Sequence, residues 1–296
     1  MYSVARTIYS KIQGWPLIGT ICTAAKPFIK SALFWWSKPS FFTSTDFRVL
    51  FVPPKVVRNA PRLRQTLMEH SVGFFDFGCS QGGATLIVST NTGLTGLGFD
   101  RDIRKLKLAL KNGIFCSNAD ILDIPDEPLV PFVIMFDFLE HLYSRTEVYT
   151  FIDKACRVSR DNVFISQPFH DADQLLFADG FKTYYSHWRG HRNSTTTTDF
   201  FHHLCKMKAR SAISDFVIGY KQPIFSSDHN FIHSLASPID SHQYDPAKHP
   251  PKKLNFRFPY DVFAKIVVAI DISGKGYGKF LKELSPDRIA YDSKQT

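Results

Sequence analysis

The residues of this chain best suited to chemistry lie in a glycine-rich turn that directly follows an apolar run. Residues 74–77 (FFDF) form the run, and residues 78–83 (GCSQGG) form the turn. A buried strand that ends in a loop with little side chain allows the backbone to approach a ligand closely. Further along, residues 98–100 (GFD) end a second apolar run with a carboxylate. Two strand ends, one bare loop and one acid at this spacing are typical of a nucleoside site in an open α/β sheet.

Three chemistries use a strand, a glycine turn and a helix. A dinucleotide fingerprint requires glycines at positions that are Gly78, Ser80 and Gly83 here, so the middle glycine that admits the pyrophosphate is missing. The serine-hydrolase elbow G-x-S-x-G matches residues 78–82 literally and would make Ser80 the nucleophile. That fold places several strands and an oxyanion loop before the elbow, and no glycine-rich segment of that kind lies upstream here. The third chemistry is the binding of S-adenosylmethionine, which has no pyrophosphate and depends less on the middle glycine.

Acidic residues after the predicted strands favour the third chemistry. Asp76 precedes the first glycine of the turn, where a carboxylate can orient the loop and lie near the amino group of the cofactor. Asp100 could accept hydrogen bonds from both ribose hydroxyls. After the third predicted strand, Asp120 could accept from the adenine amino group, and the apolar Ile121 could pack on the ring.

The chain resembles the class I S-adenosylmethionine-dependent methyltransferases, in their small-molecule branch. The resemblance rests on four motifs in order: residues 75–82 (FDFGCSQG), 98–100 (GFD), 119–121 (ADI) and 136–142 (FDFLEHL). His191, placed before a run of threonines and a predicted helix, is also similar to that branch. The match covers roughly residues 70–220. Ser80 is a departure from the pattern, because a glycine is commoner at that position.

The resemblance implies S-adenosyl-L-methionine as cofactor and methyl transfer to the oxygen or nitrogen of a small molecule, such as a sugar or a lipid-linked metabolite. It implies that the following residues bind the cofactor: Asp76, Gly78, Ser80, Gly82, Asp100, Arg101, Asp120, Ile121 and Asp137. No metal is expected. The pairs His187/His191 and His229/His233 have a spacing that can chelate a metal on a helix, but no acidic partner motif accompanies them, and coincidence explains them better.

Candidate catalytic residues follow the fourth predicted strand and recur further along the chain. Asp137 and His141 would lie beside the methyl-bearing end of the cofactor, with His141 or His191 as general base. Each also has a structural interpretation: Asp137 as a turn acid and His141 as a histidine packed under the next helix. The stretch after the fifth predicted strand should border the acceptor pocket, and its candidate substrate-binding residues are His170, Tyr184, Trp188 and Arg189. A tightly packed helix-to-loop corner is the alternative there.

The elements that would position these residues alternate between strand and helix. Strands are expected at 73–78, 94–99, 114–118, 130–137 and 162–167, and helices at 82–91, 101–112, 145–159, 172–186 and 197–208. Apolar stretches at 214–220 and 258–272 are expected as a late antiparallel pair, and 238–256 as a loop. The pattern predicts a Rossmann-like, doubly wound α/β sheet of seven strands, mostly parallel with an antiparallel last strand. The expected domains are an N-terminal extension (1–52), a methyltransferase domain (53–273) and a C-terminal tail (274–296).

The basic character of the chain belongs to its N-terminal part. Residues 1–70 hold ten Lys and Arg against two acids, whereas residues 71–296 hold 26 against 25. The first 45 residues contain no acid, and Lys26, Pro27 and Lys30 interrupt their apolar run, so a membrane span is not expected. Two interpretations remain open: an interfacial anchor at a membrane surface and a helical lid on the catalytic domain.

Other functions are open to the same residues. A methyltransferase of RNA or protein could dock through the basic N-terminal part, although a nucleic-acid channel across the catalytic face lacks the clustered cations it would need. A non-catalytic scaffold with the cofactor fold and a serine hydrolase using Ser80 are further alternatives. Five scattered cysteines without a CxxC pair fit a reducing compartment. The chain is therefore expected to be cytoplasmic, with a peripheral membrane location as the variant that an anchor would imply.

Overall fold

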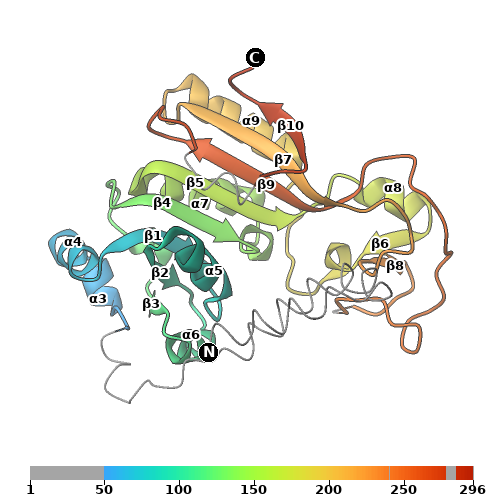
Figure 1. The fold of residues 1–296 in the computed structure, drawn as a ribbon, viewed down its shortest axis with the longest axis horizontal. Helices are drawn as coiled ribbons and strands as arrows, with labels where there is room; N and C mark the ends of the chain where they lie inside the picture. Colours follow the sequence, from blue (N-terminus) through green and yellow to red (C-terminus); the bar gives the residue numbers. More distant parts are fainter. Residues whose placement is uncertain (1–49, 240, 278–284, 296) are drawn as a thin grey trace, which may run out of the picture. The chain divides into compact units, whose positions relative to one another are not determined.

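The computed structural model describes residues 50–239, 241–277 and 285–295 (Figure 1). The expectations for the N-terminal anchor or lid lie outside these residues. None of the described helices combines the length and the apolar composition that a membrane span requires.

One large sheet carries the fold. Within the described residues it contains eight strands in the order β10-β7-β9-β5-β4-β1-β2-β3. The strands are β1 (Val72–Phe77), β2 (Thr95–Phe99), β3 (Phe115–Ser117), β4 (Val130–Phe136), β5 (Ser159–Pro168), β7 (Asp215–Pro223), β9 (Phe263–Asp271) and β10 (Arg288–Asp292). Neighbours among β1 to β5 pair in parallel, whereas β9 is antiparallel to both β5 and β7. The Rossmann-like sheet with its late antiparallel strand is therefore confirmed.

The expected strand count of seven is wrong by one strand. Residues 274–296 were expected to be a tail, but Arg288–Asp292 form β10 and pair antiparallel with the outer edge of β7. The side chain of Ser293 fixes this edge, since the backbone N–H of Phe216 donates to its Oγ at 2.8 Å. Alternation in so short and polar a segment is weak, and the neighbouring strand supplies most of the order.

Helices cover both faces of the sheet because its strands are apolar on both sides. The helices are α3 (Pro54–Val57), α4 (Ala60–Glu69), α5 (Gly83–Thr92), α6 (Ile103–Lys111), α7 (Arg145–Val158) and α9 (Thr197–Ala209). Phe75 and Phe77 of β1 share a core cluster with side chains of α4, α7 and α9. Phe74 points to the opposite face and packs with Val88 of α5, and Leu106 of α6 lies in a third cluster with Cys116 of β3. The side chains of β1 therefore pack against helices on both faces of the sheet.

Side-chain caps explain why the helix starts were predictable. Ser144 accepts from the backbone N–H of Glu147 and begins α7, which ends one residue before the expected position. Thr196 and Asp199 form a reciprocal capping box at the start of α9. Such caps satisfy backbone donors that have no partner inside a helix. Both helices were expected within one residue of their observed bounds.

The expected helix at 172–186 is wrong for most of its length. Only Asp173–Ala178 is α-helical (α8), Gly180 follows with φ +84°, and a 3-10 turn at Tyr185–His187 ends the range. The chain then forms β6 (Phe181–Thr183), which pairs antiparallel with β8 (Ile232–Ser234). A left-handed glycine ends a helix, and the apolar side chains after it favour a strand.

Two excursions leave the sheet at its carboxyl edge and pair with each other (Figure 1). The first excursion (residues 169–196) lies between β5 and α9, and the second (residues 224–262) lies between β7 and β9. A hydrogen bond joins the two ends of the first excursion, since Gln167 Nε2 donates to the Thr195 carbonyl at 2.8 Å. The β6–β8 pair joins the excursions. As expected, the described part of 238–256 contains no helix or strand.

Candidate cofactor and acceptor site

The glycine turn between β1 and α5 has three residues in the left-handed region. Gly78, Ser80 and Gly82 have φ values of +79°, +52° and +83°. A Cβ added to Gly78 would lie 2.3 Å from Phe138 Cδ2, and one added to Gly82 would lie 2.5 Å from Ile114 Cγ1. Glycine is therefore required at both positions for backbone conformation and for space. Ser80 occupies a left-handed conformation that a glycine would adopt more easily, so the departure seen in the sequence carries a cost in backbone strain.

Asp100, at the end of β2, holds the glycine turn in place. Its Oδ2 accepts from the backbone N–H of Ser80 at 3.0 Å, and its Oδ1 accepts from the N–H of Asp102 at 2.8 Å. The side chain is half-buried. A carboxylate has about four lone-pair positions, so two remain for further donors such as a pair of hydroxyls.

Asp76 lies deeper, on β1, and is 1% exposed. Thr85 of α5 donates to its Oδ2 at 2.6 Å. Burial raises the pKa of this carboxyl from 3.8 to about 7, and the bonds from Thr85 only partly oppose that effect. The structure thus gives Asp76 a place beneath the turn, joining β1 to α5.

Two residues expected at the cofactor site, one after β2 and one after β3, lie together. Arg101 Nη2 and Asp120 Oδ2 form an ion pair at 2.6 Å. The other oxygen of Asp120 accepts from the backbone N–H of Leu122 at 3.0 Å and begins the 3-10 helix η2 (Ile121–Asp123), in which Ile121 is buried. Asn118 was not predicted as a site residue, although its buried Oδ1 finds no hydrogen-bond partner within the part of the chain that the structure describes.

Asp137 follows β4 and has φ +50°, an uncommon conformation for a residue with a side chain. Its backbone N–H donates to the Ser166 carbonyl at 2.8 Å, and its carboxylate forms an ion pair with Lys265 of β9. Lys265 was missed by the sequence analysis. Its signal was a cation inside the otherwise apolar run 262–270.

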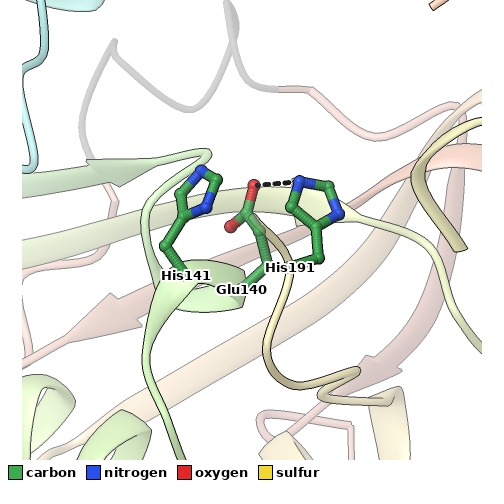
Figure 2. A group of neighbouring side chains, drawn as sticks. All are labelled: Glu140, His141 and His191. Carbon is green, nitrogen blue, oxygen red and sulfur yellow. Dashed lines mark ion pairs between the residues drawn. The ribbon is translucent and has the colours of Figure 1, made fainter. Parts of the chain in front are cut away.

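His141 and His191 lie together, as Figure 2 shows, with Glu140 between them. Glu140 and His141 belong to the 3-10 helix η3 (Leu139–His141), and His191 comes from the first excursion. His191 Nε2 lies 4.0 Å from Glu140 Oε1, and the two imidazole ring centroids are 5.1 Å apart. Burial, with a contribution from Asp137, raises the pKa of Glu140 to about 8, and burial lowers the pKa of His191 to about 4. Glu140 was also missed by the sequence analysis.

The expected substrate-binding residues separate into two groups. Tyr184 and Trp188 pack edge to face at 6.1 Å, and each also contacts His242 of the second excursion. Arg189 is exposed. His170 is instead buried, with Nδ1 3.0 Å from Asp173 Oδ2 and no hydrogen bond to Nε2.

Two further features bear on the alternatives. In the described residues no hydrogen bond joins the Ser80 hydroxyl to a histidine, so the base that a serine hydrolase needs is not in place. A cavity of about 250 Å³ lies between residues 223–225 and 258–263. None of the expected site residues lines it.

Comparison with known proteins finds similarity at the level of structure. No protein-family model and no curated protein sequence matches the chain. A methyltransferase dependent on S-adenosylmethionine from Archaeoglobus fulgidus is 14% identical, with 74% of this chain and 94% of that chain covered and a TM-score of 0.45. The magnesium protoporphyrin IX methyltransferase of Synechocystis, solved with S-adenosylhomocysteine, is 12% identical, with coverages of 83% and 94% and a TM-score of 0.39. A methyltransferase from Methanosarcina mazei is 11% identical, with coverages of 70% and 96% and a TM-score of 0.40. Similarity at this level does not by itself assign a function.

Proposed function

We propose that the chain is an S-adenosylmethionine-dependent methyltransferase that acts on a small molecule. The observation that carries the proposal is the arrangement at the ends of β1, β2 and β3, which are neighbours in the sheet. They present the glycine turn, Asp100 and Asp120 at one edge, and Asp100 is bonded to the turn itself. This set matches the parts of a nucleoside with a thioether arm.

The sheet topology favours a ligand at this edge. The chain runs from β1 outward through β2 to β3, and then crosses to β4 on the other side of β1. In open α/β sheets, ligands bind in the crevice where the strand order reverses. The crevice lies between β1 and β4, so the glycine turn would hold the cofactor on one side and Asp137 with His141 would lie on the other.

The role of the protein in such a reaction is alignment and proton removal. The sulfonium already activates the methyl group, so positioning the acceptor in line supplies most of the rate. His141 has one ring nitrogen bonded to the Gly190 carbonyl at 2.9 Å, which leaves the other free to accept a proton. Tyr184 and Trp188 of the first excursion, with His242 of the second, would form walls for the acceptor.

Calorimetric titration of S-adenosylmethionine and S-adenosylhomocysteine into the full chain tests the proposal. We expect binding of one molecule with micromolar affinity. Asp100→Asn keeps an oxygen for the Ser80 N–H but loses the charge that favours two hydroxyl donors, so affinity should fall by about tenfold to a hundredfold. Asp161→Asn is the matched control, because Asp161 precedes the buried part of β5 at the opposite edge and its side chain pairs with Lys275 at 3.4 Å.

Two outcomes would contradict the proposal. Folded protein that binds neither compound has no cofactor site of this kind. Equal affinities in the wild type and Asp100→Asn would place the cofactor elsewhere in the molecule.

A further inference from the structure

Three side chains at the end of β4 have the composition of a metal site. They are Glu140 and His141 of η3 and His191 of the first excursion (Figure 2). One ligand atom from each side chain lies within 4.8 Å of the other two. The excursion is tied to η3 at this point, since the backbone N–H of Arg192 donates to the Glu140 carbonyl at 2.8 Å. The fold therefore brings two distant segments together around this group.

Both histidines are held in the form that binds metals. The Nδ1 of His141 lies 2.9 Å from the Gly190 carbonyl, and the Nδ1 of His191 lies 2.9 Å from the Tyr185 carbonyl. A carbonyl can only accept, so each Nδ1 carries the hydrogen and each Nε2 keeps a lone pair. A backbone carbonyl in this position orients a metal-ligating imidazole and increases its basicity.

Glu140 supplies a buried acid with an unused oxygen. Its side chain is 2% exposed, and its Oε2 has no hydrogen-bond partner among the described residues. Lys265 forms its ion pair with Asp137, and His191, which lies 4.0 Å from Glu140, has a pKa lowered to about 4 by burial and so offers no positive charge near neutral pH. Burying a carboxylate without a partner is costly, and a bound cation removes that cost.

We propose that Glu140, His141 and His191 bind one divalent transition-metal ion. One carboxylate oxygen and two imidazole nitrogens suit Zn²⁺, Mn²⁺, Fe²⁺ or Co²⁺, whereas Mg²⁺ and Ca²⁺ favour oxygen ligands. Bonds of about 2.1 Å in a tetrahedral centre set the ligand atoms about 3.4 Å apart. The ligand atoms now lie within 4.8 Å of one another, so the side chains would have to move inward to reach that spacing.

The metal also defines the acceptor, and this step rests on the proposed function. With the ion bound, the remaining ring nitrogen of His141 is a ligand, so water takes the proton in place of His141. Three protein ligands leave a coordination position open, and a metal-bound hydroxyl loses its proton to water at a far lower pH than a free one. The resulting oxygen forms a bond to the methyl carbon. The carbon–sulfur bond of the sulfonium breaks, and its electron pair stays on sulfur as the neutral thioether. The acceptor is therefore a compound with a hydroxyl group.

Titration of Co²⁺ into the full chain after treatment with a chelator tests the site, because Co²⁺ absorbs visible light according to its ligands. We expect one ion per chain. Loss of an outer partner of a metal ligand already costs about 10–100-fold in affinity, so loss of a ligand in Glu140→Gln or His191→Gln should cost about 100-fold or more. His203→Gln is the matched control: His203 lies 2.9 Å from Asp153, a similar pair without a third ligand, and this variant should bind like the wild type.

Thermal unfolding in the absence of metal checks that the variants fold. Glu140→Gln removes a buried carboxyl whose ionised form is costly and should keep or raise the melting temperature, while Co²⁺ should raise it only in the wild type and His203→Gln. Absence of Co²⁺ binding to the wild type, or equal binding by Glu140→Gln and His191→Gln, would overturn the metal site. If one variant fails to fold, the other decides the question.

The two proposals fail separately. The Co²⁺ titration contains no S-adenosylmethionine, so a chain that binds Co²⁺ but neither cofactor form keeps the metal site and loses the methyltransferase. A chain that binds the cofactor but no Co²⁺ loses the metal site and keeps the proposed methyltransferase function.

Discussion

The charged residues of the site differ chiefly in how far the fold removes them from water. Asp100 is half-buried and accepts two backbone N–H groups, an arrangement that suits an ionised carboxylate. Asp76 and Glu140 are almost fully buried, and burial raises the pKa of both. Burial therefore changes the pKa of the carboxyls of Asp76 and Glu140, whereas Asp100 stays partly open to water.

The raised pKa of Asp76 predicts a pH-dependent cost in stability. Above its ordinary pKa of 3.8 the unfolded chain releases this proton, but the folded chain keeps it until the pH nears 7. The folded state then binds more protons, so this group lowers the free energy of unfolding as pH rises from about 4 to about 7. Asp76→Asn should remove the penalty: relative to wild type it should gain roughly 2–4 kcal/mol between pH 4 and pH 7.5 in urea unfolding. A difference between the two chains that stays constant with pH would contradict the burial effect.

Among the elements, the turn between β1 and α5 is the most constrained. Neighbouring glycines in it have opposite requirements: Gly82 has φ +83° and a close neighbour in Ile114, whereas Gly83 has nothing within 4 Å of an added Cβ. Substitution of Gly83 is therefore a control for substitution of Gly82 within the same turn.

Gly82→Ala should destabilise the chain, and Gly83→Ala should not. The first forces a left-handed conformation and a clash, costing about 2 kcal/mol or more. The second adds a methyl group at the start of α5 and should be neutral or stabilising by up to about 1 kcal/mol. Chemical unfolding of both variants compares them, and cofactor affinity should fall only in Gly82→Ala. Equal losses in the two variants would mean that the turn has less influence than its geometry indicates.

The sequence predicted those elements whose signals are local. The strands and helices from β1 to β5 follow hydrophobic periods and capping residues, such as Ser144 before α7. The β6 strand and β10 were missed because each depends on pairing with a segment far along the chain. Glu140 and Lys265 were missed for the same reason, since an acid in a short turn and a cation in a strand gain meaning only from the residues that the fold places beside them.

For the whole molecule, β10 closes the outer edge of the sheet. It pairs with β7 next to Gly219, where an added Cβ would lie 2.4 Å from Pro286 and 2.9 Å from the Arg288 carbonyl. The edge thus depends on a close approach between backbones that only glycine permits.

Gly219→Ala should weaken the pairing of β10 with β7 without disturbing the candidate cofactor and acceptor site. The clash with the Arg288 carbonyl should cost about 1–3 kcal/mol. Trypsin should then cleave after Arg288 and Lys294 faster than in the wild type, because cleavage requires local opening. Gly83→Ala lies far from this edge of the sheet and should be cleaved at the wild-type rate. Unchanged cleavage in Gly219→Ala would show that β10 tolerates the shift.

The two excursions have a consequence for how such a molecule can change over generations. Each leaves and re-enters at the carboxyl edge, and the paired residues Pro223 and Phe263 clamp the base of the second. Insertions or deletions beyond that clamp leave the hydrogen bonds of the eight-stranded sheet in register. Acceptor preference can therefore diversify by exchange of whole loops, while the part of the molecule that would hold the methyl donor is inherited unaltered.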